Sequence, residues 1–335
     1  MKIVICTDAS RPQINGVVTT LEHTKTELEN LGHEVIMIEP SLFATIPCPS
    51  YSEIRLAYNA FWHLPRLINE IDPDSIHIAT EGPIGAAARL YCALKQIPYS
   101  TSYHTKFPEY VRKRWPIPLW VTYGYLRLIH GSAKAILVTT GSMATELHER
   151  GFKNLVVWSR GVDSDLFSPS RATDLGLPRP IHLSVGRISI EKGLDDFLAL
   201  QIPGTKLVVG DGPQLKDMKS RYPDAIFVGA KRGTDLATYY ASADVFVFPS
   251  KTDTFGVVML EAMASGTPVA AYPVTGPKDV ITNGSGKLDT DLKRAIEHCY
   301  TIDRRQCAEL GRTFTWESCA RTFLNSLAII PKFTR

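Results

Sequence analysis

The stretch 249–273 carries residues whose types and spacing suit the binding of a phosphorylated sugar. A polar loop follows the apolar run that ends at Phe248, and Gly256 then opens a predicted helix over residues 257–264. Phosphates bind at helix N-termini because the first N–H groups are free and the dipole is positive there. Asp253 precedes this helix and Glu261 lies within it, so two carboxylates are available to sugar hydroxyls. The pattern predicts a nucleotide-sugar pocket, and the competing interpretation is an ordinary crossover with two solvated acidic residues.

This stretch resembles the acidic-x7-Glu motif of family 4 glycosyltransferases, which are retaining enzymes with the two-domain GT-B fold. The resemblance implies that Asp253 contacts hydroxyls of the donor sugar and that Glu261 contacts the ribose. The family often has Glu where this chain has Asp253. The start of the helix is expected to bind the donor and its diphosphate through Phe255, Gly256, Val257 and Val258.

Two basic residues flank a turn after the predicted strand 181–185. Arg187 and Lys192 match the family's G-R-x4-K-G pattern. Two cations at this turn can neutralise a diphosphate leaving group, and an arginine can do so with two hydrogen bonds. Stabilising that developing charge is the main task in glycosyl transfer. A solvated basic turn is the competing interpretation, and the spacing to Asp253 and Glu261 argues against it.

Three further positions are assigned to donor binding by the same resemblance. Gly210 begins a G-x-G-P turn that shapes the pocket floor, and Val228 lies where the family holds the base through backbone groups, so uracil and guanine both stay open. Gly16 follows the first strand without a G-x-G-x-x-G pattern. The resemblance implies that Gly16 lets the donor come close, although a plain tight turn is equally compatible with the residues.

His104 lies at the carboxyl end of the predicted strand 99–103, within a run that resembles the family's Y-H-T-x-F-P-x-Y segment. The resemblance places His104 near the anomeric carbon, so the expected catalytic set is His104, Asp253, Arg187 and Lys192. A D-x-D sequence at 163–165 is not taken as a metal site, because it lies beside the predicted domain linker. No metal or other cofactor is expected.

Residues 110–134 form a basic-aromatic segment with five basic residues, five Trp or Tyr residues and no acidic residue. Such a composition suits an interface with anionic lipid. The expected membrane contacts are Arg112, Lys113, Arg114, Trp115 and Trp120. The competing interpretation is a core-packing helix with a solvated basic edge. A net charge of +3 and the absence of a recognisable module argue against nucleic acid.

Length and patterning indicate a two-domain α/β protein. The 335 residues exceed one ordinary core, and 44% hydrophobic content is typical of a globular chain. The six cysteines lack metal-ligand spacing, which favours reduced thiols. Two series of apolar runs predict two doubly wound parallel sheets facing a cleft. Their strands are 2–6, 34–38, 75–78, 99–103, 135–138 and 154–157, then 181–185, 206–209, 225–228, 245–248 and 269–271.

The expected domains are an acceptor-side domain, 1–168, and a donor-binding domain, 169–314. In GT-B folds a last helix crosses back onto the first domain, and residues 315–330 match it by resemblance. The N-terminal apolar run is too short for a signal peptide, and no stretch is long enough to span a bilayer. We therefore expect a cytoplasmic protein held peripherally on the inner membrane.

The resulting hypothesis is a metal-independent, retaining hexosyltransferase with a nucleotide-sugar donor and a membrane lipid, such as diacylglycerol, as acceptor. A UDP-sugar carrying glucose or glucuronic acid is favoured, by likeness to bacterial glycolipid synthases. A GDP-mannose-dependent α-mannosyltransferase is the alternative. A nucleotide-sugar epimerase of the same fold comes third. A non-enzymatic sugar-binding protein is disfavoured, because it has no need for Arg187 and Lys192 at a diphosphate position.

Overall fold

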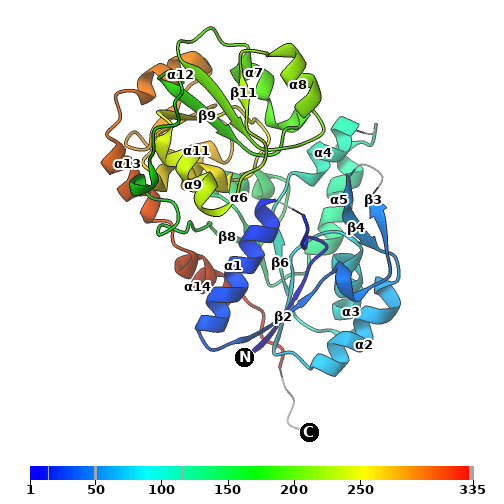
Figure 1. Cartoon of the computed structure of the whole chain (residues 1–335). Helices are drawn as coiled ribbons and strands as arrows, with labels where there is room; N and C mark the ends of the chain where they lie inside the picture. The colour runs from blue at the N-terminus through cyan, green and yellow to red at the C-terminus, as the bar shows by residue number, and fades with distance from the viewer. Residues whose placement is uncertain (14, 49–50, 115, 332–335) are drawn as a thin grey trace. The chain divides into compact units, whose positions relative to one another are not determined.

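The chain forms two compact α/β units in a computed structural model that describes residues 1–13, 15–48, 51–114 and 116–331 (Figure 1). Unit 1 comprises Met1–Ser159 and Trp316–Arg335, and unit 2 comprises Arg160–Thr315. Among the described residues each unit contains a six-stranded sheet in which every pair of neighbouring strands is parallel. The predicted α/β class with two doubly wound parallel sheets is confirmed.

The sheet of unit 1 has the strand order β2-β1-β5-β6-β7-β8. Its strands are β1 (Lys2–Cys6), β2 (Glu34–Ile38), β5 (Ser75–Ile78), β6 (Ser100–Tyr103), β7 (Ala135–Val138) and β8 (Leu155–Val157). Its helices are α1 (Gly16–Asn30), α2 (Ala60–Ile71), α3 (Pro83–Lys95), α4 (Phe107–Arg114), α5 (Leu119–His130), α6 (Gly141–Glu149) and α14 (Trp316–Asn325). A hairpin of β3 (Thr45–Cys48) and β4 (Tyr51–Ala57), which the sequence pattern did not indicate, precedes α2.

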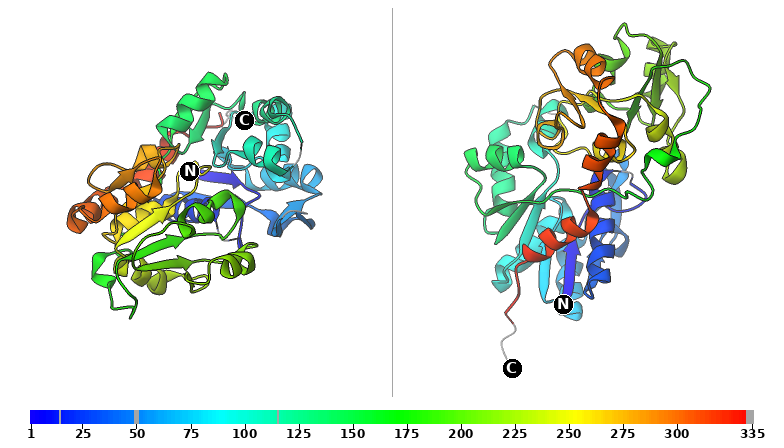
Figure 2. Two further views of the ribbon diagram at one scale, coloured as in Figure 1. Left: turned by 90° about the horizontal axis from the view of Figure 1, so that it is seen from above. Right: turned by 90° about the vertical axis from the view of Figure 1, so that its left-hand side faces the viewer.

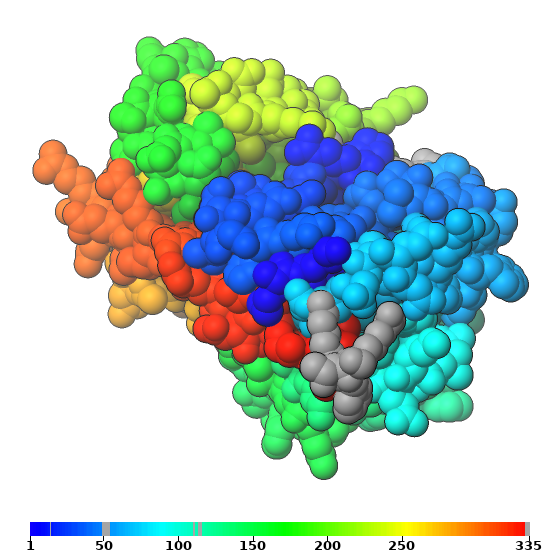
Figure 3. All heavy atoms as spheres, turned by 90° about the horizontal axis from the view of Figure 1, so that it is seen from below, coloured from blue at the N-terminus to red at the C-terminus, as the bar shows by residue number. Residues whose placement is uncertain are grey.

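Helices cover both faces of this sheet because alternate residues of a buried strand point to opposite sides. From β1, Ile3 and Ile5 join a core with α1 and α14. Val4 and Cys6 join the opposite core with α2, α3, α5 and α6. Figure 2 shows α1 and α14 side by side, and the space-filling view in Figure 3 shows the red C-terminal segment against the blue N-terminal one.

The sheet of unit 2 has the strand order β11-β10-β9-β12-β13-β14. Its strands are β9 (Ile181–Val185), β10 (Thr205–Val209), β11 (Ile226–Phe227), β12 (Val245–Phe248), β13 (Val269–Ala271) and β14 (Gly286–Leu288). Its helices are α7 (Leu194–Leu198), α8 (Leu215–Arg221), α9 (Gly233–Ser242), α10 (Val257–Ala264), α11 (Pro277–Val280), α12 (Leu292–Cys299) and α13 (Arg304–Arg312). The sequence pattern did not predict β14, because Gly286–Leu288 is too short and polar to read as an apolar run.

The division between the units comes before the predicted boundary at residue 168. Residues 160–168 pack on unit 2: the Val162 amide donates to the Phe314 carbonyl at 3.0 Å, and Phe167 lies edge-on to Tyr240. The polar stretch 167–174 looked like a linker from its composition. The apolar side chains just before it decide the boundary.

The basic-aromatic segment is two helices, which differs from the single core-packing helix considered above. Helix α4 ends at Arg114 and α5 begins at Leu119. Pro116 and Pro118 lie between them. A proline lacks the N–H and restricts the residue before it, so one helix cannot continue through this segment.

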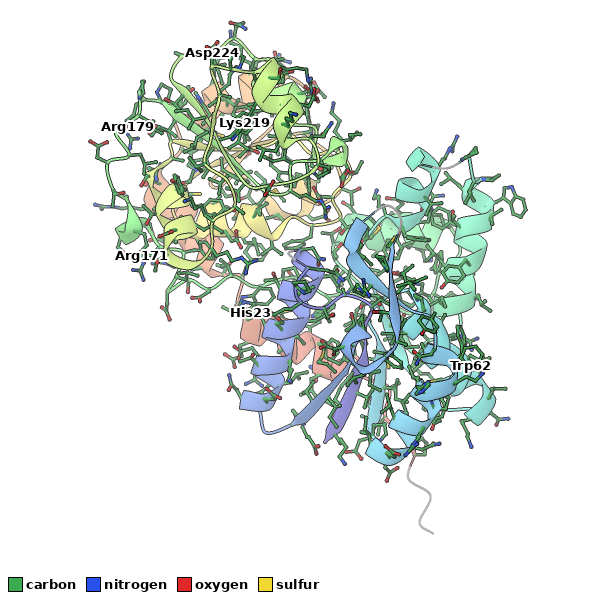
Figure 4. All side chains as sticks on the ribbon, turned by 45° about the vertical axis from the view of Figure 1, so that its right-hand side comes forward. His23, Trp62, Arg171, Arg179, Lys219 and Asp224 are labelled. Atoms are coloured by element: carbon green, nitrogen blue, oxygen red, sulfur yellow. The ribbon has the colours of Figure 1, made fainter. Side chains whose placement is uncertain are left out.

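Helix α14 is bound to unit 1 by a buried aromatic cluster. The Trp158 indole N–H donates to the Cys319 carbonyl at 3.0 Å. Phe323 is buried with its ring centroid 5.2 Å from that of Trp158 and 4.6 Å from that of His77. Trp316, the first residue of α14, contacts α1. The ring of His23, labelled in Figure 4, stacks on the Trp316 ring with 4.4 Å between the ring centroids.

We predict that Phe323→Ala destabilises unit 1 by about 3–5 kcal/mol, because it removes a fully buried ring and leaves a cavity. The matched control on the same helix is Arg321→Ala, which removes only an exposed i,i+4 pair with Glu317. Urea unfolding should separate the two variants, and proteolysis should cut α14 of the first variant sooner. Equal stability of both variants would contradict the packing role of Phe323.

Candidate functional site

The loops that follow β9, β10 and β12 meet at one edge of the unit 2 sheet. Parallel pairing joins β9 to β10 and to β12, so the carboxyl ends of all three strands lie together. Arg187 and Lys192 follow β9, Gly210 follows β10, and Asp253 follows β12. The topology thus brings these four predicted donor-binding residues to a common edge.

Lys192 and Asp253 form an ion pair in this edge. The Lys192 Nζ donates to both carboxylate oxygens of Asp253, at 2.7 and 2.9 Å. Both side chains are partly buried. Two hydroxyls of the following loop, from Ser250 and Thr252, donate to the Glu191 carbonyl at 3.3 and 3.2 Å and hold the loop against the turn that carries Lys192. The sequence assigned these two residues to separate parts of a ligand, whereas the structure pairs them directly.

The N-terminus of α10 lies at the same edge of the sheet and has no side-chain cap from its N-cap residue. Its N-cap, Gly256, has φ of 90° and offers no side-chain acceptor. A β-carbon at Gly256 would come within 2.9 Å of the Phe248 ring, so glycine is required there on two grounds. Val257 and Val258 supply the first N–H groups of the helix, with no side-chain cap among the described residues. This terminus can therefore donate to a phosphate.

Helix α1, where Gly16 was predicted to approach the donor, is arranged differently. Gly16 is its first residue, and the Asn15 Oδ1 accepts from the amides of Val17 and Val18, each at 3.0 Å. These amides are already satisfied. Close approach of a ligand to Gly16 stays a prediction, while binding of a phosphate by this helix end would have to displace its own cap.

Glu261 accepts a hydrogen bond from Tyr240 within unit 2. The Tyr240 hydroxyl donates to Oε2 of Glu261 at 2.8 Å. Burial raises the pKa of Glu261 to about 7, and the Tyr240 hydrogen bond acts in the opposite direction. The sequence pattern did not indicate this raised pKa. No feature of the sequence pointed to Tyr240, because its contact with Glu261 joins two helices.

The turns at this edge approach each other so closely that side chains are excluded. A β-carbon at Gly210, which has φ of 152°, would lie 1.9 Å from the Gly186 carbonyl oxygen. The Gly210 amide donates to the Gly229 carbonyl at 2.9 Å, and the Val228 amide donates to the Val208 carbonyl at 3.1 Å. The predicted floor of the donor pocket is thus a set of hydrogen-bonded backbone turns. The Val228 amide is not free for a base, because it donates to the Val208 carbonyl.

In unit 1, His104 follows β6 and is nearly buried. Its Nε2 lies 2.8 Å from the Ser102 hydroxyl, and its ring is edge-on to Trp158 at 5.6 Å. Ser102 also lies 3.1 Å from Nε2 of His77, a buried residue whose pKa burial lowers to about 3. His77 is therefore neutral. Ser102 could have been found from the sequence, since side chains two apart in a strand share a face.

The exposed side chains of unit 1 include a large apolar set on α5 and the adjacent α3. Trp120 is 76% exposed and Leu128 is 61% exposed, while the opposite side of α5 is buried through Tyr123 and Leu126. Leu94 on α3 is 76% exposed. On α2, Trp62, labelled in Figure 4, is 75% exposed.

Arg112 is exposed on α4. Trp115 and the side chains of Lys113 and Arg114 lie outside the described residues. Among the residues that the structure describes, no helix has the length and apolar character to cross a membrane. In the same part of the chain, no group of three His, Cys, Asp or Glu side chains is placed to hold a metal ion. In the D-x-D sequence, the Asp163 carboxylate instead accepts from the amides of Asp165 and Leu166, at 3.1 and 2.9 Å.

Comparison with known families covers most of both units. Residues 14–166 match the model described as Glycosyltransferase Family 4, and residues 179–297 match the model described as Glycosyl transferases group 1.

The chain is also similar to several named glycosyltransferases. The chain is 31% identical to a sulfoquinovosyl transferase of Arabidopsis thaliana over 80% of its length, and it spans 58% of that protein. It is 28% identical to a GDP-mannose-dependent alpha-mannosyltransferase of Corynebacterium glutamicum, over 87% of this chain and 77% of the relative. It is 27% identical to an alpha-monoglucosyldiacylglycerol synthase of Streptococcus pneumoniae, over 81% of this chain and 71% of the relative.

Solved structures share the fold. A sucrose-phosphate synthase from Thermosynechococcus elongatus superposes with a TM-score of 0.78 at 22% identity, over 97% of both chains. Anabaena HepE, crystallised with UDP-glucose, superposes with a TM-score of 0.71 at 18% identity, over 97% of this chain and 98% of that one. These structures show a fold of the GT-B type. The two family matches and the relatives show that the chain belongs to the family 4 glycosyltransferases.

Proposed function

We propose that the chain is a retaining hexosyltransferase that moves a hexose from a nucleotide diphosphate sugar to a membrane lipid such as diacylglycerol. The observation that carries this proposal is the Lys192–Asp253 pair next to the uncapped N-terminus of α10. This edge offers a cation and free N–H groups to a diphosphate, and a carboxylate to sugar hydroxyls. A pocket for a neutral sugar alone would need neither the cation nor the free N–H groups.

In the proposed reaction the bond between the anomeric carbon and the diphosphate oxygen breaks while the acceptor hydroxyl oxygen bonds to that carbon on the same face. The acceptor proton passes to the departing phosphate oxygen. Arg187, Lys192 and the amides of Val257 and Val258 stabilise the leaving charge. Glu261 accepts from the ribose, Asp253 from the hexose, and His104 contributes from unit 1 near the anomeric carbon. No metal takes part in this scheme.

The donor is proposed to be a UDP-sugar, with glucose or glucuronic acid as the hexose. The similarity to a monoglucosyldiacylglycerol synthase supports a glucosyl donor and a glycerolipid acceptor. A GDP-mannose-dependent mannosyltransferase is the second candidate, because three relatives bear that name at 28–29% identity. The Asp253 position and the backbone-lined floor at Gly210 and Val228 are compatible with both.

Access to a lipid acceptor is proposed to come from peripheral contact of unit 1 with an anionic bilayer on the cytoplasmic face of the membrane. The exposed apolar residues Trp120 and Leu128 lie on α5, directly after the basic run at residues 112–114. Leu94 extends this apolar surface onto α3, which packs against α5. Apolar side chains at the level of the head groups with basic residues beside them suit such docking.

A thermal-shift panel of UDP, GDP, UDP-glucose, UDP-glucuronate and GDP-mannose, with EDTA present, tests the donor. A ligand at about one hundred times its Kd should add ~2.7 kcal/mol of stability. We expect stabilisation by the uridine compounds. Stabilisation by the guanosine compounds alone would favour the mannosyltransferase. The absence of any shift would contradict the assignment of a nucleotide-sugar donor.

Asp253→Asn should lower kcat by at least about tenfold while changing the free energy of unfolding by only about 1 kcal/mol, because the Lys192–Asp253 pair is partly solvated. The control is Asp196→Asn, which weakens a more exposed pair with Lys251 in the same unit. Steady-state transfer assays and urea unfolding provide the two readouts. A parallel loss of turnover and stability would mean that Asp253 is a structural residue.

Replacement of Arg112, Lys113 and Arg114 by serine should weaken binding to vesicles that contain anionic lipid by about one hundredfold, at ~1 kcal/mol per basic residue. Lys216, Lys219 and Lys293, exposed on unit 2, provide the control with the same change in charge. Vesicle flotation and transfer to diacylglycerol would both be measured. If the triple variant floats and reacts like the control, the membrane proposal is wrong.

A further inference from the structure

Tyr240 is a fully buried residue with its hydroxyl directed at a carboxylate of the candidate donor site. It lies on α9 and has no exposed surface. Its hydroxyl donates to Oε2 of Glu261 on α10, at 2.8 Å. The two helices are held together by their shared core. The other carboxylate oxygen of Glu261, Oε1, has no hydrogen-bond partner among the described residues. The Glu261 side chain is only partly buried.

The ring of Tyr240 is held from several sides. Phe167 lies edge-on at 5.7 Å and Phe246 lies tilted at 5.5 Å between ring centroids. The Tyr240 carbonyl accepts from the Thr267 hydroxyl at 2.6 Å. Because packing fixes the ring, the hydroxyl has one available position, and that position is at Glu261. A hydroxyl held in this way orients its acceptor more strictly than a mobile one could.

We propose that Tyr240 is a positioning residue for nucleotide recognition: its hydroxyl holds Oε2 of Glu261, so that Oε1 is presented to the ribose hydroxyls of the donor. This inference rests on the proposed function and adds to it a residue that no sequence motif marks. Tyr240 does not touch the ligand. It acts through Glu261, and its removal should therefore affect only ligands that carry ribose hydroxyls.

The charge state of Glu261 provides a second readout. Burial raises the pKa of Glu261 to about 7. A folded-state pKa above the ordinary value means that the carboxylate forms only as the pH rises through about 7, and ribose binding should strengthen over the same range. The hydrogen bond from Tyr240 favours the charged form. Replacing Tyr240 by phenylalanine should therefore move the midpoint to higher pH.

Few other ionisable groups bear on this carboxylate. The pKa of Tyr240 is well above its usual value because of burial, so it stays a donor. On α13, burial raises the pKa of Cys307 to about 12, so that thiol stays neutral. Arg304 donates to the Ala241 carbonyl of α9 and to the Ala243 carbonyl just after that helix. Other charged groups near α10 include the paired Lys192 and Asp253. The elements that pack on α10 add the exposed Asp235 of α9 and the exposed Arg305, Glu309 and Arg312 of α13.

The test compares the wild-type protein with Tyr240→Phe and with the matched control Tyr239→Phe, which changes the neighbouring, partly buried tyrosine of the same helix. The probes are UDP and 2′,3′-dideoxy-UDP, titrated calorimetrically from about pH 6 to about pH 8.5. Both probes carry the same diphosphate, so the ratio of their affinities cancels the ionisation of phosphate and isolates the ribose hydroxyls.

We expect Tyr240→Phe to weaken UDP binding about tenfold, the usual effect of losing a hydrogen bond to a charged group, and to leave dideoxy-UDP binding unchanged. The affinity ratio should rise with pH in the wild type, with its midpoint moved upward in this variant. Tyr239→Phe should match the wild type. An identical ratio and midpoint in all three proteins would overturn the positioning role while leaving the proposed function intact.

A direct measurement covers the case in which Tyr240→Phe does not fold. The carboxyl carbon of Glu261 can be followed by ¹³C NMR in the wild-type protein. Its signal should change on addition of UDP and stay in place on addition of dideoxy-UDP. A signal that responds equally to both would contradict the inference. Failure of the wild type to bind either UDP or GDP would instead contradict the proposed function itself.

Discussion

The parallel pairing of β9 with β10 and with β12 is the constraint on which the unit 2 site depends. It places the carboxyl ends of three strands side by side, so that residues far apart in the chain share one edge. The turns close there only because they lack side chains, since a β-carbon at Gly210 would lie only 1.9 Å from the Gly186 oxygen. A shift of β9 relative to β12 would separate Lys192 from Asp253.

Two charged groups at this edge are paired within the protein. Lys192 is paired with Asp253, and the pKa of Glu261 is raised by burial. Partly buried charges are costly when they are neither paired nor solvated, which explains both features. In the proposed complex a diphosphate and a ribose take up these same groups. We propose that the ligand replaces these internal partners when it binds.

Unit 1 combines buried polar groups behind His104 with exposed apolar residues on α5. The polar groups behind His104 form a neutral chain through Ser102 and His77, buried against Trp158. Helix α5 of unit 1 buries Tyr123 and Leu126 but exposes Trp120 and Leu128. Core packing alone does not require large apolar side chains on the exposed side of the helix. Unit 2 thus places an ion pair at the candidate donor site, whereas unit 1 exposes an apolar surface on α5, which fits the proposed division between donor and lipid acceptor.

The α/β class, the family and nearly all of the strands could be predicted from the sequence alone, because buried parallel strands are continuous apolar runs and the family motifs are local. The same motifs predicted Arg187, Lys192, Asp253 and Glu261 as donor-binding residues. The polar hairpin β3–β4 and the short β14 were missed, since neither has an apolar run. The pairing of Lys192 with Asp253 and the hydrogen bond from Tyr240 to Glu261 emerge only in the folded chain. Those contacts join separate elements, and no local spacing along the chain encodes them.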